Sequence, residues 1–114
     1  MATATEVAER LRGDIAQRAF QLARWIVDRQ AIAFSHGAGT SLPLFQFDFA
    51  HGCVRTGVAP VILELSGLMT DYELACWFVQ PNGWLNGAAP ALTLLSDVPA
   101  LVDAARADRF VAKG

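Results

Sequence analysis

Residues 80–95 read Gln-Pro-Asn-Gly-Trp-Leu-Asn-Gly-Ala-Ala-Pro-Ala-Leu-Thr-Leu-Leu and place a large aromatic side chain, Trp84, on a tight turn. The proline, asparagine and glycine at 81–83 cannot continue a helix, and Asn-Gly at 86–87 supplies a second turn whose glycine accepts a positive φ. Pro90 suits the first turn of a new helix, because its missing N–H is not needed there. The stretch therefore predicts two helices joined by a rigid corner. An aromatic residue fixed in such a corner is either a plug of the core or an anchor for a partner.

Helical signals lie on both sides of this corner. Before it, residues 58–68 predict a short helix, and Thr70 with Glu73 has the form of a capping box that starts another. After it, Pro90 begins a helix of about two turns, and Asp97 is a plausible N-cap for a final one. The C-terminal half is therefore predicted to be helical throughout.

The N-terminal part carries a second set of patterns. Apolar residues recur every three or four positions from Glu6 to Gln30, which predicts one long amphipathic helix, although Gly13 could divide it in two. Residues 1–5 are expected to fray. Ala31–Phe34 and Leu44–Phe49 are short and apolar, and the second alternates with period two, so the pair predicts a β-hairpin.

These patterns predict a mainly α fold, a small helical domain with a long N-terminal helix and a short β-hairpin. We divide the chain into residues 1–30, a helical segment that could mediate dimerisation, and residues 31–114, which form the interaction domain. A length of 114 residues fits one domain.

Composition narrows the function classes. The chain is 54% hydrophobic and only 18% charged, so we expect an exposed apolar patch that marks a partner or a homodimer interface. A net charge of −2 argues against direct nucleic-acid binding. Two cysteines, Cys53 and Cys76, and no signal peptide indicate a reducing cytoplasm. We expect no segment of the chain to cross a membrane.

Candidate chemical residues are sparse. Asp48, His51 and Cys53 lie within six residues and could suggest a nucleophile with its base, but no oxyanion-hole motif accompanies them. A metal site from His36, His51 and Cys53 lacks paired ligand spacing. We therefore predict no catalytic residue, no cofactor and no metal, and a protein that is not an enzyme.

The three tryptophans differ in their surroundings. Trp25 and Trp77 lie on apolar helical stripes, which is typical of core packing. Trp84 lies on its turn, and the sequence leaves the core and docking interpretations about equally open.

Two segments resemble a known family. Residues 42–48, Leu-Pro-Leu-Phe-Gln-Phe-Asp, followed by Gly52, are similar to the signature that opens the toxin-binding domain of the Xre/MbcA/ParS antitoxins. Residues 81–90, followed by a leucine pair at 94–95, resemble the second signature of that family, and residues 102–109 also fit. The resemblance covers roughly residues 31–110.

The resemblance implies a function in toxin neutralisation. Members of the family bind toxins of the RES type, which consume NAD or use it to modify a target, and they cover the active-site entrance of the toxin. The implied mechanism is steric occlusion, with residues near the C-terminus reaching toward the NAD pocket. Arginine forks pair well with carboxylate or phosphate. The implied toxin-binding residues are Trp84, Leu85, Asn86, Gly87, Pro90, Arg106 and Arg109.

This chain departs from the family pattern in two ways. The segment before Ala31 is too short for the three-helix DNA reader that family members carry, so we expect no helix-turn-helix. Ala88 and Ala89 stand where many relatives have polar or basic residues. They favour an alternative function, a self-associating interaction or regulatory adaptor module that has lost toxin inhibition.

Overall fold

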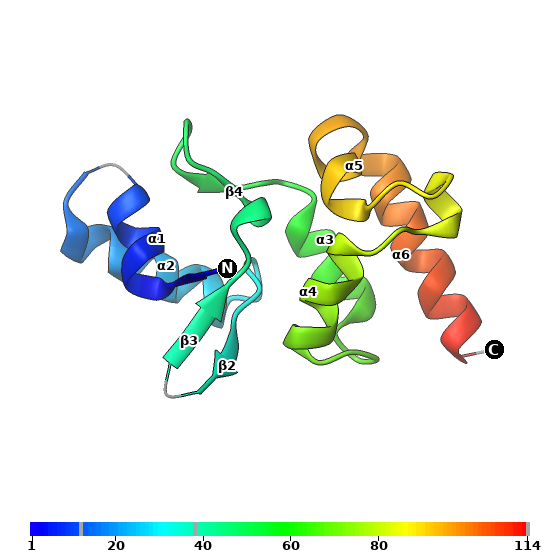
Figure 1. Cartoon of the computed structure of the whole chain (residues 1–114), viewed down its shortest axis with the longest axis horizontal. Coiled ribbons are helices and arrows are strands. Elements are labelled where there is room, and N and C mark those ends of the chain that lie inside the picture. Colours follow the sequence, from blue (N-terminus) through cyan, green and yellow to red (C-terminus); the bar gives the residue numbers. More distant parts are fainter. Residues whose placement is uncertain (12, 38, 114) are drawn as a thin grey trace. The chain divides into compact units, whose positions relative to one another are not determined.

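The computed structural model describes residues 1–11, 13–37 and 39–113, and it has the mainly helical fold that the sequence predicts (Figure 1). The chain forms two compact units, Met1–Arg55 and Thr56–Gly114, which we describe separately. The units divide after Arg55, whereas separate roles for residues 1–30 and 31–114 stay a prediction.

The N-terminal helical segment is two helices rather than one, α1 (Ala4–Arg10) and α2 (Ile15–Val27). Gly13 between them has a φ of +117°, a backbone conformation that residues other than glycine rarely adopt. The Asp14 carboxylate accepts a hydrogen bond of 3.1 Å from the backbone N–H of Gln17 and so starts α2. The glycine therefore divides the helix, and the apolar periodicity continues across the break.

The first sheet is antiparallel with strand order β1-β3-β2. Its strands are β1 (Ala2–Thr3), β2 (Phe34–His36) and β3 (Gly39–Leu42). Ala2 pairs with Leu42, so the first residues are held by backbone hydrogen bonds and not frayed, contrary to expectation. A second sheet pairs β4 (Phe47–Asp48) with β5 (Cys53–Val54), after the short 3-10 helix η1 (Leu44–Gln46).

A short β-hairpin is present, as predicted, but it is formed by β2 and β3 and not by residues 31–34 and 44–49. The Gln46 side chain supplies the physical reason for this difference. Gln46 is fully buried, its Oε1 accepts a hydrogen bond of 2.7 Å from the Ile32 N–H, and its Nε2 donates one of 2.8 Å to the Ile32 carbonyl. The side-chain amide thus forms hydrogen bonds with the backbone N–H and carbonyl of Ile32, as a neighbouring strand would. Residues 44–46 are consequently free to form η1 instead of a strand.

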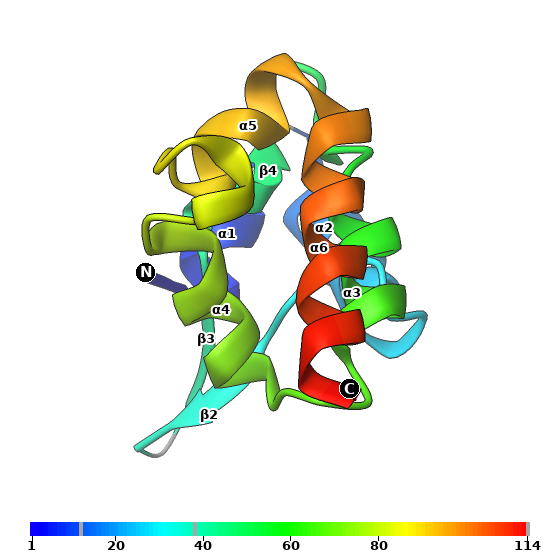
Figure 2. The same cartoon turned by 90° about the vertical axis from the view of Figure 1, so that its right-hand side faces the viewer.

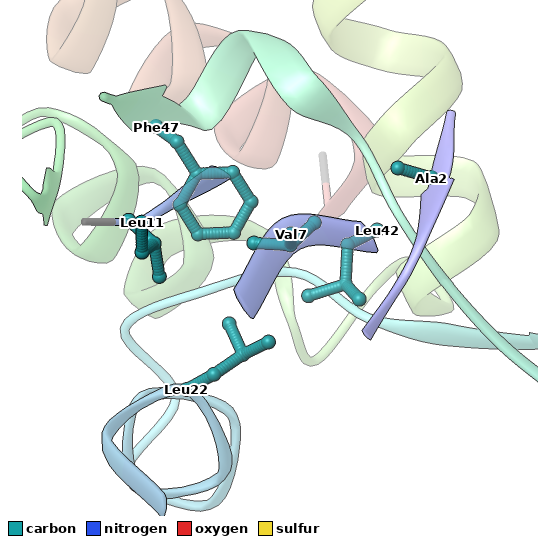
Figure 3. Packing of buried hydrophobic residues seen from close by; sticks show 6 residues of the cluster. All are labelled: Ala2, Val7, Leu11, Leu22, Leu42 and Phe47. Carbon is teal, nitrogen blue, oxygen red and sulfur yellow. The ribbon is translucent and has the colours of Figure 1, made fainter. Parts of the chain in front are cut away.

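The core of the N-terminal unit gathers residues from α1, α2, both sheets and the turn after α1. The close view in Figure 3 shows Val7 between Phe47 and Leu42, with Leu22 of α2 pointing toward them. The Phe47 ring lies 6.4 Å from Trp25 and 5.6 Å from Phe49, measured between centroids. The buried members are Ala2, Val7, Leu11, Leu22, Leu42 and Phe47.

The C-terminal unit contains four α-helices and one 3-10 helix in its described residues. They are α3 (Val58–Leu65), α4 (Asp71–Val79), η2 (Gly83–Leu85), α5 (Pro90–Ser96) and α6 (Val98–Lys113). Figure 2 shows α6 beside α3, with α5 and η2 packed against it on another side. The helices α3 and α5 and the turn η2 pack against the long α6, whereas α4 packs against α5.

Local signals place most of these helix starts where the sequence predicts them. At α4 the Thr70 hydroxyl accepts from the Glu73 N–H at 3.2 Å, and the Glu73 carboxylate accepts from the Thr70 N–H at 3.0 Å, so the capping box is confirmed. The hydrogen bond from the Thr70 backbone lowers the pKa of the Glu73 carboxyl. Pro90 begins α5, and Asp97 accepts a hydrogen bond from the Ala100 N–H in the first turn of α6.

Candidate functional site

The corner between α4 and α5 is organised around Asn82, which is 8% exposed. Its side-chain Oδ1 accepts a hydrogen bond of 2.8 Å from the Trp84 N–H, and its backbone carbonyl accepts from Leu85 at 3.0 Å and Gly87 at 2.9 Å. Its own N–H donates to the Ala88 carbonyl at 3.1 Å. The predicted rigid corner is therefore present, with one buried asparagine hydrogen-bonding on both sides of η2.

A carboxylate on α6 ties this corner to the rest of the unit. Asp108 Oδ1 accepts a hydrogen bond of 2.8 Å from Trp84 Nε1, and Oδ2 accepts one of 2.7 Å from Trp77 Nε1. The Asn82 side-chain amide donates to Oδ2 at 3.3 Å. Two indoles from different elements are thus oriented by one acid, since the donors are fixed in direction by their rings.

Sequence reasoning missed Asp108, although a signal for it exists. The buried stripe of α6 contains Leu101, Ala104 and Ala105, which are 0%, 2% and 0% exposed. Asp108 comes one turn after Ala104 and falls on the same stripe. An acidic residue at such a position indicates a partnered carboxylate.

The structure distinguishes the three tryptophans. Trp77 is 8% exposed and Trp25 is half-buried against Phe47, so both pack in the units that contain them, as predicted. Trp84 is 57% exposed, while its indole N–H donates a hydrogen bond to Asp108. Its ring is therefore fixed at one edge and open to solvent over much of its surface, which is the geometry of an anchor and not of a core plug.

The neighbours of Trp84 in the predicted site differ in exposure. Asn86, which has a left-handed φ of +57°, and Gly87 are exposed, while Leu85 is half-buried. Pro90 is buried as the first residue of α5. The exposed residues offer surface to a partner, whereas Pro90 shapes the corner from within.

The two arginines of the predicted site face α3. Arg106 Nε donates to Glu64 Oε1 at 2.9 Å, and Arg109 Nη1 lies 3.0 Å from Glu64 Oε2. The Glu64 side chain is only 11% exposed. We regard the second contact as an ion pair, because no described group donates a well-aligned hydrogen bond to Oε2. Both guanidinium groups are thus engaged on a different side of α6 from Asp108.

The residues considered for catalysis or metal binding lie in the N-terminal unit. His51 Nδ1 is 2.7 Å from Asp48 Oδ2, and this hydrogen bond lowers the pKa of the Asp48 carboxyl. Cys53 is exposed and pairs with Asp48 across the β4–β5 ladder. The side chain of His36 lies outside the described part of the chain. Among the described residues, no three His, Cys, Asp or Glu side chains come together as a metal site would need.

An exposed apolar surface is present on α2, as the composition predicts. Ile15, Phe20 and Val27 are 56%, 67% and 76% exposed. Beside them lies a groove of about 230 Å³ between α1 and α2. It is lined mainly by small or apolar side chains, among them Ala4, Ala8, Ala19, Ala23 and Ile26.

In the ranges that the structure describes, no helix has both the length and the apolar character needed to span a bilayer. Comparison of the chain with protein-family models, with curated proteins and with solved structures found no match.

Proposed function

We propose that this chain is a cytoplasmic, antitoxin-like protein that binds a RES-type NAD-consuming toxin and neutralises it by steric occlusion. The observation that carries the proposal is the exposed indole of Trp84, held on a rigid corner by Asp108 and Asn82. Tryptophan is enriched among residues that dominate binding energy, and a side chain that is already ordered loses little conformational entropy on binding. The same corner carries the second motif of the family resemblance.

Occlusion suits this arrangement because it needs shape and not reactive groups. A short 3-10 turn that projects one aromatic ring can enter a concave active-site entrance and exclude the substrate. Arg106 and Arg109 are the proposed auxiliary contacts. Each would have to weaken its pairing with the nearly buried Glu64 to reach a toxin, so we expect the corner to supply more of the affinity.

The test pairs the chain with the protein encoded beside its gene. We expect the two to co-elute as one complex, and we expect the chain to prevent the loss of cellular NAD that the neighbour alone causes. The measurements are size-exclusion chromatography of the co-expressed pair and an assay of NAD content. A neighbour that consumes NAD equally with or without this chain, and elutes apart from it, contradicts the proposal.

The second candidate function is a self-associating adaptor module without toxin inhibition. The apolar surface of α2 favours it, because an amphipathic helix whose large side chains face solvent is a common homodimer interface. In a two-fold dimer the same patch meets itself, so the exposed Phe20 of one copy could enter the α1–α2 groove of the other. Dimerisation is compatible with both functions, and the NAD assay separates them.

Replacing Phe20 with glutamate tests the dimer. We expect the wild-type chain to sediment as a dimer and Phe20→Glu to sediment as a monomer, because a charge would then be desolvated at the interface. Leu92→Glu is the matched control, since Leu92 is 64% exposed on α5 and should leave the dimer intact. Analytical ultracentrifugation over a range of concentrations measures both. A wild-type chain that stays monomeric, or a Phe20→Glu variant that stays dimeric, removes this interface.

A further inference from the structure

A polar hollow lies beside Trp84, where α4 ends and α6 passes. It encloses about 240 Å³, and its walls are Trp77, Gln80, residues 81–83, Trp84 and Asp108. Two aromatic rings, two side-chain amides and one acid therefore meet in the same small volume. The contacts within this volume decide what it could hold.

The hollow carries negative charge without a matching cation. Asp108 is the one ionisable group among its described walls, and the three donors on its carboxylate are neutral, two indole N–H groups and an amide. These neutral donors leave the unit charge of the carboxylate in place. A carboxylate has about four acceptor positions, so about one, on Oδ1, remains open.

The helix that ends at the hollow adds to this potential. Gln80 is the C-cap of α4, and the last turn of α4 contains no basic residue. The C-terminal carbonyls of a helix carry partial negative charge and favour a cation nearby. The end of α4 and the Asp108 carboxylate therefore both favour a bound cation, and each does so for a separate physical reason.

The aromatic walls select the form of the cation. The indole N–H of Trp84 lies in the ring plane and donates to Asp108, so the carboxylate lies at the ring edge and not over a ring face, and the residue is 57% exposed. A cation that bonds to the open carboxylate position can therefore also lie against an indole face. The planar guanidinium group does both, because it stacks on aromatic rings and donates hydrogen bonds in its plane, whereas an ammonium group is a compact, strongly hydrated point charge.

We propose that this hollow is a binding site for the guanidinium group of an arginine side chain presented by a partner protein. The arginine would donate to Asp108 Oδ1 and lie against Trp84, so that one acid both fixes the indole and receives the partner. The site goes beyond the proposed function, because it concerns the chemistry of the contact and holds for any partner that presents an arginine here.

The test uses the whole chain and N-acetyl-arginine amide as the probe, with the indole N–H signals followed by two-dimensional NMR. We expect the signals of Trp77 and Trp84 to shift saturably, while that of Trp25, in the other unit, stays unchanged as an internal reference. N-acetyl-citrulline amide is the matched neutral probe, since it has nearly the shape of arginine without its charge. Equal shifts with the two probes, or no saturation, overturn the proposal.

Variants and a second probe sharpen the result. Asp108→Asn should weaken arginine binding by about tenfold or more, because the charge is removed. Unchanged binding by a folded Asp108→Asn chain overturns the site, and if that variant does not fold, the citrulline comparison on the wild-type chain decides. Free arginine, which carries its own carboxylate, should bind no better than the capped probe. Much tighter binding of free arginine would indicate an amino-acid site and overturn the assignment to a partner protein.

The outcome is separable from the proposed function. A chain that neutralises its toxin but binds neither probe leaves toxin inhibition standing and removes the arginine site. A chain that binds the arginine probe but leaves its neighbour active keeps the site and removes the inhibitor function.

Discussion

Gln46→Ala is expected to lower the free energy of unfolding of the N-terminal unit by about 2–5 kcal/mol. The Gln46 side chain is fully buried, and its amide makes both of its hydrogen bonds to the backbone of Ile32, itself fully buried. Truncation leaves the Ile32 N–H and carbonyl without these partners in an interior that water does not reach freely, and it opens a cavity as well. Urea denaturation followed by circular dichroism measures the change.

Gln46→Glu is the informative companion, because it keeps the length of the side chain but cannot donate when ionised. At neutral pH it should also destabilise the unit, since a buried carboxylate would face the Ile32 carbonyl. Burial raises the pKa of such a carboxyl in the folded state, so the stability deficit should shrink as the pH falls and the protonated acid regains a donor. Gln30→Ala, at an exposed position, should change stability by less than about 0.5 kcal/mol. A Gln46→Ala chain that unfolds at the urea concentration of the wild type would contradict the role assigned to this amide.

Trp84→Ala is expected to weaken binding of the proposed toxin partner by about 2–4 kcal/mol, which is roughly 30-fold to 1000-fold in Kd. The exposed indole is ordered before binding by Asp108, so its removal costs contact area that no neighbouring side chain can replace. Isothermal titration calorimetry with the purified toxin measures the affinity. Leu63→Ala is the control, since Leu63 is 80% exposed on α3 and outside the corner.

The same variant separates docking from packing. Because Trp84 is 57% exposed, its truncation should reduce the free energy of unfolding by only about 1 kcal/mol, mainly through the lost hydrogen bond to Asp108. Trp84→Phe keeps an aromatic ring without the N–H and should retain part of the affinity. A Trp84→Ala chain that loses several kcal/mol of stability while binding the toxin as before would show that the indole serves the fold and not the partner.

The features that the sequence predicts well are those encoded within a few residues. Thr70 and Glu73 satisfy each other's backbone donors three positions apart, and Pro90 acts at the first turn of its own helix. The turns around Trp84 depend on Asn82 and Gly87, which lie beside it. Local chemistry of this kind does not need knowledge of the tertiary fold, so the helix starts and the corner could be placed in advance.

The features that sequence reasoning missed depend on residues far apart in the chain. Asp108 meets Trp84 and Trp77 across separations of 24 and 31 positions. The Gln46 side chain makes the hydrogen bonds to the Ile32 backbone that a neighbouring strand would make, although the two residues are 14 positions apart. A contact of this kind leaves no periodic pattern in the sequence. The alternating phenylalanines of 44–49 indicate a strand, and the structure has one only at Phe47–Asp48, because residues 44–46 form η1. The division of the N-terminal helix is different, because Gly13 is a local signal for the break, while the apolar stripe that continues across it favours one helix.

The three hydrogen bonds on Asp108 also set the smallest fragment that could replace the whole protein in binding the proposed partner. A synthetic peptide of residues 80–95 would contain the indole but not the acid, so the ring would be free to rotate. The conformational entropy lost when the ring becomes ordered would then reduce the binding free energy. A useful mimic must extend from the end of α4 to Asp108 in α6, or carry a covalent staple that fixes the orientation of the indole as the carboxylate does.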